Sequence, residues 1–302
     1  MQQLQRPEWI YFNGELRPWE DGVLHISTEA LTRGLNVFEG LKGYWNEDSS
    51  EFSLIALREH YERLRHSSQL LYIPFEHSFD EFKDAVSMLV DKLLRRDDDM
   101  WIRATLFVVD GHWGENTQSD LVCTAYHQTK DRPSPISVGI STWQRPGDLS
   151  LPARIKTSTN YQAGRLARIE GRRRGFGEMI MMNQWGRVAE ASGSCVIAVR
   201  GNKLVTPPAY EGCLESITVD LVEIIAKDLG LDFERRPLER TELYVADEMA
   251  IVGTLAELVP VEQIEDIKLE MPQRVLQRVA DRFWKAVRGT EPLTGLELTR
   301  VR

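Results

Sequence analysis

The sequence predicts an α/β (α+β) fold in two parts, and three observations support this. The first part has two segments with helical periodicity and then two β-rich runs, a polar stretch with two prolines follows, and short strands dominate the rest. Helices that pack on a sheet form an α/β layer. We therefore expect an N-terminal α/β domain over residues 1–126, a linker over 127–135 and a second domain over 136–302.

The elements of the first part follow from turn chemistry and spacing. Trp9 to Phe12, Asn13-Gly14 and Glu15 to Arg17 are typical of a short hairpin. Apolar residues at helical spacing predict one helix from Arg58 to Leu71 and another from Phe79 to Leu93. The two β-rich runs that follow are Trp101 to Val109 and Leu121 to Tyr126.

The second part is expected to contain short strands interrupted by two helices. One helix is predicted from Tyr161 to Arg174, with Asn160 as its N-cap and Gly175 just past its end. The other runs from Ile217 to Leu229 and stops at Gly230. The predicted strands are Ile136 to Thr142, Glu178 to Asn183, Cys195 to Val199 and Glu248 to Val252, with hairpin turns at Asn183 to Gly186 and Arg200 to Lys203.

Composition excludes several classes of protein. No run approaches the roughly 18 apolar residues of a membrane span, and residues 1–7 lack the apolar core of a signal peptide. The formal net charge of −9 disfavours nucleic acid as a partner, and the basic run Arg172 to Arg174 is better explained as a helix end. Three cysteines without a C-x-x-C pair fit a reducing cytoplasm.

Familiar catalytic and metal motifs are missing. The chain has no G-x-x-x-x-G-K-[ST], G-x-S-x-G or H-E-x-x-H, and no G-x-G-x-x-G after a strand. Its six histidines are scattered without ligand spacing. We therefore expect no metal site.

Three stretches have residues suited to chemistry, although each also has an ordinary structural explanation. Lys156 lies among small and polar residues just before a helix; it is either a solvated charge or an amine positioned to form an imine. Glu190 lies among tiny residues between two β-runs; it is either a solvated turn residue or the partner of a cationic flat ligand. The helix start at Leu214 to Asp220 is either a normal cap or a phosphate site.

Taken together in this order, these stretches resemble the class IV aminotransferases, the branched-chain aminotransferase family of fold-type IV pyridoxal-phosphate enzymes. The resemblance covers nearly the whole chain. It depends on five further stretches: Ile10 to Gly14, Gly34 to Gly40, Arg58 to Leu64, Leu243 to Glu248 and Val252 to Leu258. It implies a two-domain fold in which a β-barrel-like C-terminal domain contains the lysine that binds pyridoxal 5′-phosphate.

The resemblance also implies roles for individual residues. Lys156 would form the internal aldimine and move the proton, Glu190 would bind the pyridine nitrogen, and Tyr161 would bind the phenolic oxygen. Arg58, Ile217, Thr218 and Thr254 match phosphate-binding positions. Phe38 and Arg103 fall where the family lines its substrate pocket, and Leu255 belongs to a turn that offers N–H groups to a substrate carboxylate. A homodimer is implied as well.

The substrate residues depart from the family pattern. Arg33 and Trp101 replace expected tyrosines, Ala104 replaces a proline, Cys195 an asparagine and Ser216 a glycine. With both Arg33 and Arg103 facing the pocket, an anionic substrate would be favoured; alternatively, Arg33 turns outward or pairs with an acidic neighbour. Leucine, isoleucine and valine are therefore not assumed as substrates.

The expected function is transfer of an amino group between an amino acid, or an amine, and a 2-keto acid. The first alternative is a pyridoxal-phosphate lyase on the same fold, like aminodeoxychorismate lyase, because one fold and cofactor site support several reactions. The second is a non-catalytic protein that binds the cofactor. A scaffold would have no physical need of Lys156, Glu190 and Tyr161, which disfavours the last alternative.

Overall fold

The computed structural model describes residues 4–301 and divides into two compact units. Met1 to Gln3 of the amino-terminal segment considered above, and Arg302, therefore lie outside the described residues. The first unit comprises the chain up to Asp131 together with Ile155–Thr159 and the segment from Val287 onward. The second unit comprises Arg132–Arg154 and Asn160–Ala286. The five-residue segment that contains Lys156 thus packs with the first unit, although its neighbours in sequence on both sides belong to the second.

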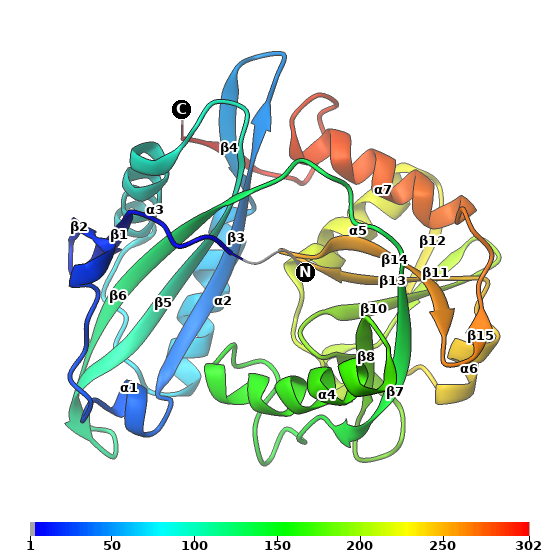
Figure 1. Cartoon of the computed structure of the whole chain (residues 1–302), viewed down its shortest axis with the longest axis horizontal. Helices are drawn as coiled ribbons and strands as arrows, with labels where there is room; N and C mark the ends of the chain where they lie inside the picture. Colours follow the sequence, from blue (N-terminus) through cyan, green and yellow to red (C-terminus); the bar gives the residue numbers. More distant parts are fainter. Residues whose placement is uncertain (1–3, 302) are drawn as a thin grey trace. The chain divides into compact units, whose positions relative to one another are not determined.

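The first unit is built on an antiparallel sheet in the order β16-β4-β3-β5-β6-β1-β2, seven strands within residues 4–301 (Figure 1). Its strands are β1 (Trp9–Phe12), β2 (Glu15–Pro18), β3 (Asn36–Asn46), β4 (Glu51–Ile55), β5 (Asp99–His112), β6 (Glu115–Gln128) and β16 (Leu298–Arg300). The hairpin predicted at Asn13-Gly14 is confirmed, with both residues at positive φ. The β-rich runs are confirmed as β5 and β6, which extend further than predicted.

Helices cover the first sheet. The two predicted helices are confirmed as α2 (Leu57–Leu70) and α3 (Phe79–Leu93), and the unit also contains α1 (Glu29–Thr32) and the 3-10 turn η1 (Trp19–Asp21). α2 packs on β3, and α3 packs on β1 and β6 (Figure 1). The apolar faces of α2 and α3 meet the sheet in a core that includes Leu41, Phe52, Leu64 and Phe82, all fully buried. Ile155, from the Lys156 segment, belongs to the same core.

The second unit contains a mixed sheet in the order β12-β11-β10-β13-β14-β7-β8-β9, with β15 beside β14; these nine strands lie within the described part of the chain. All of them except β9 are labelled in Figure 1. Its strands are β7 (Ile136–Gln144), β8 (Glu178–Met182), β9 (Val188–Ala191), β10 (Cys195–Arg200), β11 (Lys203–Thr206), β12 (Asp232–Arg235), β13 (Glu248–Gly253), β14 (Glu257–Ile264) and β15 (Ile267–Lys268). β9, at one end of the order, also contacts β10. The sheet therefore curls into a barrel-like shape around a core that includes Ile180, Val196 and Ile251.

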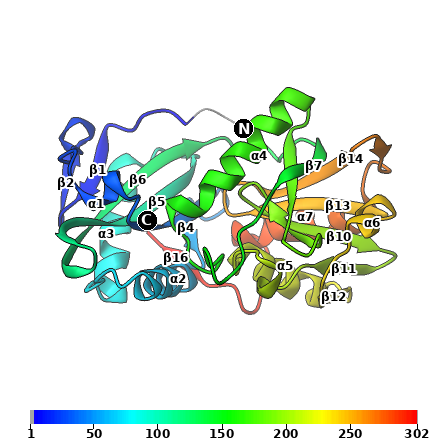
Figure 2. The same cartoon turned by 90° about the horizontal axis from the view of Figure 1, so that it is seen from below.

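Helices also flank the second sheet. They are α4 (Tyr161–Arg174), α5 (Ile217–Asp228), α6 (Arg240–Tyr244) and α7 (Arg274–Val287), with 3-10 turns η2 (Ser158–Asn160) and η3 (Ala209–Glu211). α4 packs on β7 and β8, and α5 packs on β12 and β13 (Figure 2). The predicted helices are confirmed as α4 and α5, and the chain leaves α4 through Gly175 at φ +84°. Arg172 to Arg174 form the last turn of α4, as expected.

Asn160 is the N-cap residue of α4, as predicted, but its side chain does not cap the helix. Its own backbone is helical and it makes no capping hydrogen bond. Its amide Nδ2 instead donates to the carbonyl oxygen of Pro152, at 2.9 Å. The 3-10 turn η2 leads directly into α4, so the chain enters this helix without the extended residue that a side-chain cap requires.

A buried carboxylate begins α7. Glu248, at the start of β13, accepts hydrogen bonds from the backbone N–H groups of Arg274, Val275 and Leu276, at 2.7–3.0 Å. The first N–H groups of a helix have no partner within the helix, and a negative charge at this end is favoured by the helix dipole. This contact anchors α7 to the curled sheet.

We expect Glu248→Ala to lower the free energy of unfolding by about 2–3 kcal/mol, because it leaves buried N–H donors without an acceptor. The measurement is thermal or urea unfolding followed by circular dichroism. Glu262→Ala, which removes an exposed glutamate from β14, is the control and should change stability by less than about 0.5 kcal/mol. Equal stabilities for the two variants would contradict the capping role.

Within residues 4–301, no helix is long and apolar enough to cross a membrane.

Candidate active site

The Lys156 segment lies against the edge of β3. One edge of β3 pairs with β5 over residues 36–43, and the other pairs with β4 only over residues 43–46. The vacant edge is taken by the Lys156 segment: Phe38 N–H donates to the Lys156 carbonyl oxygen at 2.9 Å, and Val37 and Thr157 form an isolated bridge. The Lys156 N–H donates to Ser67 Oγ at 3.1 Å. The main chain of Lys156 is therefore held on both sides.

The amine of Lys156 lies near an aromatic ring and a second cation. Its Nζ is 5.1 Å from the centroid of the Phe38 ring, and the Arg103 guanidinium lies 3.8 Å from the same centroid. Arg103 is opposite Gly40 in the register of β3 and β5, so both residues belong to the face of Phe38. A Cβ on Gly40 would come within 3.0 Å of the Trp101 Nε1 atom, which shows that the indole covers Gly40. The structure thus brings Lys156, Phe38, Arg103 and Trp101 together.

Arg33 has an acidic partner. It directly follows α1, and its Nη1 lies 2.8 Å from Glu29 Oε1, four residues earlier. Its guanidinium also lies 4.7 Å from the centroid of the Trp113 ring, and the Trp113 N–H donates to Glu29. Glu29 is buried, so its charge compensates that of Arg33 locally.

Arg58 lies in the first turn of α2. Its guanidinium is 3.8 Å from the centroid of the Phe79 ring. Nine residues separate Arg58 from Ser67, or about 14 Å of helix rise. The phosphate role of Arg58 stays a prediction.

A buried ionic cluster joins α2 to β3. Glu39 is fully buried and accepts hydrogen bonds from His60 Nδ1 at 2.7 Å and from Arg63 Nε and Nη2 at 2.7 and 2.8 Å. Burial alone would raise the pKa of the Glu39 carboxyl, but the charge of Arg63 and these hydrogen bonds hold it well below its ordinary value. Burial lowers the pKa of His60, so its ring is neutral near pH 7. Glu39 is next to Phe38 in β3, so their side chains project from opposite faces of the strand, and the charge of Lys156 also helps to lower the pKa of His60.

Glu190, on β9 of the second unit, is a buried carboxylate with two donors. Arg145 Nε lies 3.0 Å from its Oε1, and the Leu214 N–H donates to its Oε2 at 3.0 Å. Arg145 is itself buried, and it also donates to the carbonyl oxygens of Asn160 and Gly212. Glu190 is therefore held in one orientation and is not a solvated turn residue.

Small residues surround Glu190 and allow close packing. A Cβ on Gly164 of α4 would lie 2.0 Å from the Ser192 carbonyl oxygen, so only glycine lets α4 lie against the turn after β9. A Cβ on Gly193 would lie 3.7 Å from Cε1 of Tyr161. Tyr161, at the start of α4, is thereby placed beside the turn that follows Glu190.

Two more predicted stretches lie beside Glu190. Leu214, which donates to Glu190, leads into α5, where Ser216 Oγ accepts the Val219 N–H at 3.3 Å. The N–H groups of Ile217 and Thr218 precede the first hydrogen bond within α5 and are available to an anion. The turn containing Thr254 and Leu255 follows Gly253, whose added Cβ would lie 3.2 Å from Ser194 Oγ. The structure thus brings Tyr161, Glu190, Ile217, Thr218 and Thr254 into one region of the second unit.

Sequence reasoning missed Arg145 and Ser67. Arg145 gave one weak signal, since it precedes Pro146 shortly after the predicted strand that ends at Thr142. Ser67 gave none beyond its position on the predicted helix. Only the tertiary contacts show that one orients Glu190 and the other binds the main chain of Lys156.

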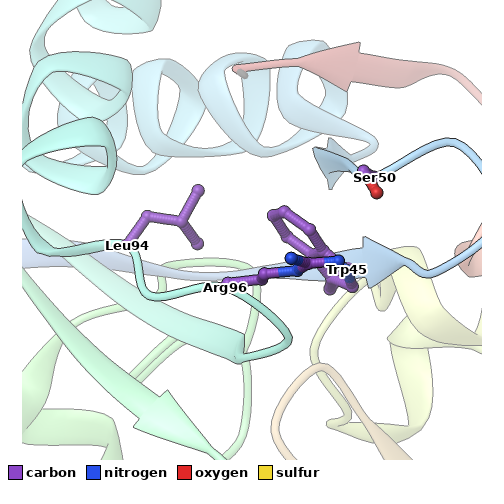
Figure 3. A pocket seen from close by; sticks show the side chains of 4 residues that line it. All are labelled: Trp45, Ser50, Leu94 and Arg96. Carbon is purple, nitrogen blue, oxygen red and sulfur yellow. The ribbon is translucent and has the colours of Figure 1, made fainter.

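No second candidate site accompanies Lys156 in a surface hollow or a metal-binding cluster of the described residues. A surface hollow of about 370 Å³ is lined by Trp45, Ser50, Leu94 and Arg96 (Figure 3). Trp45 is seven residues along β3 from Phe38, about 23 Å at the rise of a strand, so this hollow is separate from Lys156. In the part of the chain that the structure describes, no group of three His, Cys, Asp or Glu side chains could hold a metal ion.

Comparisons with known proteins agree with the sequence resemblance. The family model described as amino-transferase class IV matches residues 36–264. The chain is 32% identical over 275 residues to a branched-chain-amino-acid aminotransferase of Salmonella typhimurium, covering 88% of this chain and 87% of that protein. Its structure resembles a branched-chain amino acid aminotransferase from Thermobaculum terrenum in its PLP form, with a TM-score of 0.90, 31% identity and coverage of 98% and 99%. It also resembles the branched-chain amino acid aminotransferase of Escherichia coli, with a TM-score of 0.92, 29% identity and coverage of 98% and 100%.

Proposed function

Since this chain belongs to the class IV aminotransferase family and is an enzyme that uses pyridoxal 5′-phosphate, we propose that Lys156 binds the cofactor covalently during transfer of an amino group between an amino acid, or an amine, and a 2-keto acid. One observation supports this assignment above the others. The main chain of Lys156 is held by Phe38 and Ser67, and its amine lies over the Phe38 ring beside Arg103. A solvated surface lysine has no need of such anchoring.

The residues present fit this cofactor by their chemistry. An aldehyde requires an amine, a pyridinium nitrogen requires a carboxylate, and a phosphate requires N–H groups, hydroxyls or a guanidinium. Lys156 supplies the amine, and the buried Glu190 supplies the carboxylate. The phosphate-binding groups come from Ile217 and Thr218 at the start of the 12-residue helix α5, and from Thr254 and Arg58.

The proposed roles follow from charge and position. When bound, the cofactor supplies an electron-withdrawing ring that stabilises negative charge on the substrate's α-carbon. Lys156 Nζ would take the proton from that carbon as a general base and, as a general acid, would deliver it to the C4′ carbon of the cofactor. Glu190 binds the ring nitrogen and keeps its proton in place, because a close carboxylate favours the charged form. Tyr161 donates to the phenolic oxygen.

Arg145 supports Glu190 in this scheme. Its guanidinium and the Leu214 N–H bind different oxygens of the carboxylate, which fixes Glu190 in a buried position. Burying a carboxylate without such partners would favour its neutral form.

The substrate side is assigned to Arg33, Phe38, Trp101, Arg103 and Leu255. Arg103 is the cation that we expect to attract a carboxylate on the substrate side chain, because the charge of Arg33 is already compensated by Glu29. The indole of Trp101 covers Gly40 and so reduces the space for a substrate on the sheet face that holds Phe38 and Arg103. The relatives are named for branched-chain amino acids, but these departures make a different substrate preference part of the proposal.

A half-reaction tests the function. Incubation of the loaded enzyme with an amino donor alone should convert the visible absorbance of the bound cofactor to that of its aminated form, with release of one keto acid per active site. Addition of a 2-keto acid should then restore the original spectrum. A lyase would release product while keeping its original spectrum, and a non-catalytic binding protein would release nothing. A panel of donors, including acidic and non-proteinogenic ones, would identify the substrate.

A homodimer is also part of the proposal. Large apolar side chains of the first unit are exposed between η1 and α1, on α1 itself and at the tip of the β5–β6 hairpin: Val23, Leu24, Ile26, Leu31 and Trp113. The Arg33–Trp113 and Glu29–Trp113 contacts bring the two segments together. Contiguous exposed apolar surface is typical of protein interfaces, and a second copy of the chain is the expected partner. The domain limits at residues 127–135 and a cytoplasmic location likewise stay proposals.

A further inference from the structure

Ser67 is the side chain that holds the amide of Lys156. It is fully buried in the second half of α2, and its Oγ accepts the Lys156 N–H at 3.1 Å. On the other side of the same residue, the carbonyl oxygen of Lys156 accepts the Phe38 N–H at 2.9 Å. Ile155, one residue earlier, is buried in the core of the first unit. These contacts attach a five-residue segment to one helix and one strand.

The helix that contains Ser67 is itself held firmly. His60, Arg63 and Ser67 lie three and four residues apart, so they share the face of α2 that meets β3. His60 and Arg63 both bind the buried carboxylate of Glu39 on β3, at 2.7–2.8 Å. Hydrogen bonds to an ionised group of this kind are shorter and stronger than neutral ones. The Glu39 cluster therefore sets where Ser67 lies relative to β3.

These main-chain contacts matter because the amine of Lys156 must reach a reacting carbon with little error in position. Four rotatable bonds connect its backbone to Nζ, so a shift of the main chain moves the whole range of positions that Nζ can occupy. A displacement of about 1 Å at a reacting group can cost about 100-fold in rate. Without Ser67 Oγ, the Lys156 amide would lose this acceptor, while the contacts of the segment with β3 and the core would remain.

We propose that Ser67 is a positioning residue for the reaction: it orients Lys156 by binding its main-chain N–H, from a helix that the Glu39 cluster locks to β3. This inference rests on the proposed role of Lys156. It assigns Ser67 no contact with substrate or cofactor.

The test compares two neighbouring serines. Ser67→Ala removes the acceptor, whereas Ser68→Ala removes an equally buried hydroxyl that donates only to the Arg65 carbonyl oxygen of its own helix, at 2.8 Å. We expect Ser67→Ala to lower kcat by about tenfold or more, the equivalent of about 1.4 kcal/mol, with KM for the donor within about twofold. We expect Ser68→Ala to stay within about twofold of the unmutated enzyme in both.

Spectroscopy separates positioning from loss of structure. The visible circular dichroism band of the bound cofactor reports how firmly it is oriented, and it should weaken in Ser67→Ala but not in Ser68→Ala. Ser67→Cys, with a weaker acceptor of similar size, should lie between Ser67→Ala and the unmutated enzyme, and it decides the question if the alanine variant does not fold. Unchanged kcat and dichroism in Ser67→Ala, or in Ser67→Cys when only that variant folds, would overturn the inference. Equal losses in Ser67→Ala and Ser68→Ala would overturn it too.

Failure of the two proposals can be told apart. Borohydride reduction followed by peptide mass spectrometry shows whether the cofactor is attached to Lys156. A missing label in the unmutated protein would contradict the role of Lys156 and the inference that rests on it. A full label with unchanged kcat in Ser67→Ala would contradict only the role of Ser67.

Discussion

Lys156→Ala is expected to lower kcat by about 1,000-fold or more, because it removes both the covalent attachment of the cofactor and the group that moves the α-proton. The visible absorbance of the covalently bound cofactor should also disappear. The fold should persist, because the anchors of this segment are the main chain of Lys156 and the buried side chain of Ile155. Measurement of the half-reaction, of the spectrum and of far-ultraviolet circular dichroism would check all three expectations.

Lys42 is the control for Lys156. Lys42 is a buried lysine of β3 whose ammonium lies 5.3 Å from the centroid of the Tyr44 ring. After borohydride treatment of the loaded, unmutated enzyme, the cofactor should be found on the peptide with Lys156 and not on the peptide with Lys42. A label on Lys42, or an alanine variant at position 156 with normal activity, would refute the assignment.

Glu190→Gln should lower kcat by about 100-fold, with a smaller change in KM. The amide keeps the shape of the side chain but loses the charge that favours a protonated ring nitrogen, so developing charge at the substrate's α-carbon is stabilised less. Because Arg145 and the Leu214 N–H bind different oxygens of Glu190, the amide would keep an acceptor for only one of them, so far-ultraviolet circular dichroism should accompany the kinetics. Steady-state kinetics together with the spectrum of the bound cofactor would measure the effect.

Glu178→Gln provides a matched control for Glu190. Glu178 is a buried carboxylate on the neighbouring strand β8 and pairs with an arginine, Arg168, at 3.1 Å. It has no proposed contact with the cofactor, so its replacement should affect stability more than the spectrum. If both glutamine variants lowered kcat equally and left the spectrum unchanged, the role of Glu190 would be structural and the proposal would fail.

Local patterns predicted the elements with strong periodicity or turn chemistry. α2, α3, α4 and α5 were predicted within one or two residues at each end, because the apolar spacing of α2 and α3 and the glycines just past α4 and α5 are local features. α7 was missed, although it is 14 residues long. Its start depends on Glu248, which lies 26 residues earlier in the chain, and a partner at that separation leaves no local pattern.

The site shows the same division between local and tertiary information. Ordered motifs along the chain predicted the family, the cofactor and the fold class, because they preserve the residue types that the cofactor's aldehyde, ring nitrogen and phosphate require. The conformation of Arg33 could not be predicted in this way. Its pairing with Glu29 and Trp113 depends on a helix of only four residues and on the tip of a distant hairpin.

The amino-acid sequence by itself determined which chemical groups this protein has, their order and the family to which it belongs. Only the tertiary structure decided that Lys156 packs with the first unit, that Ser67 binds its amide and that Arg145 pairs with Glu190. The physical reason is that burial and hydrogen bonding join residues far apart in the chain, whereas periodicity and turn chemistry extend over only a few neighbours.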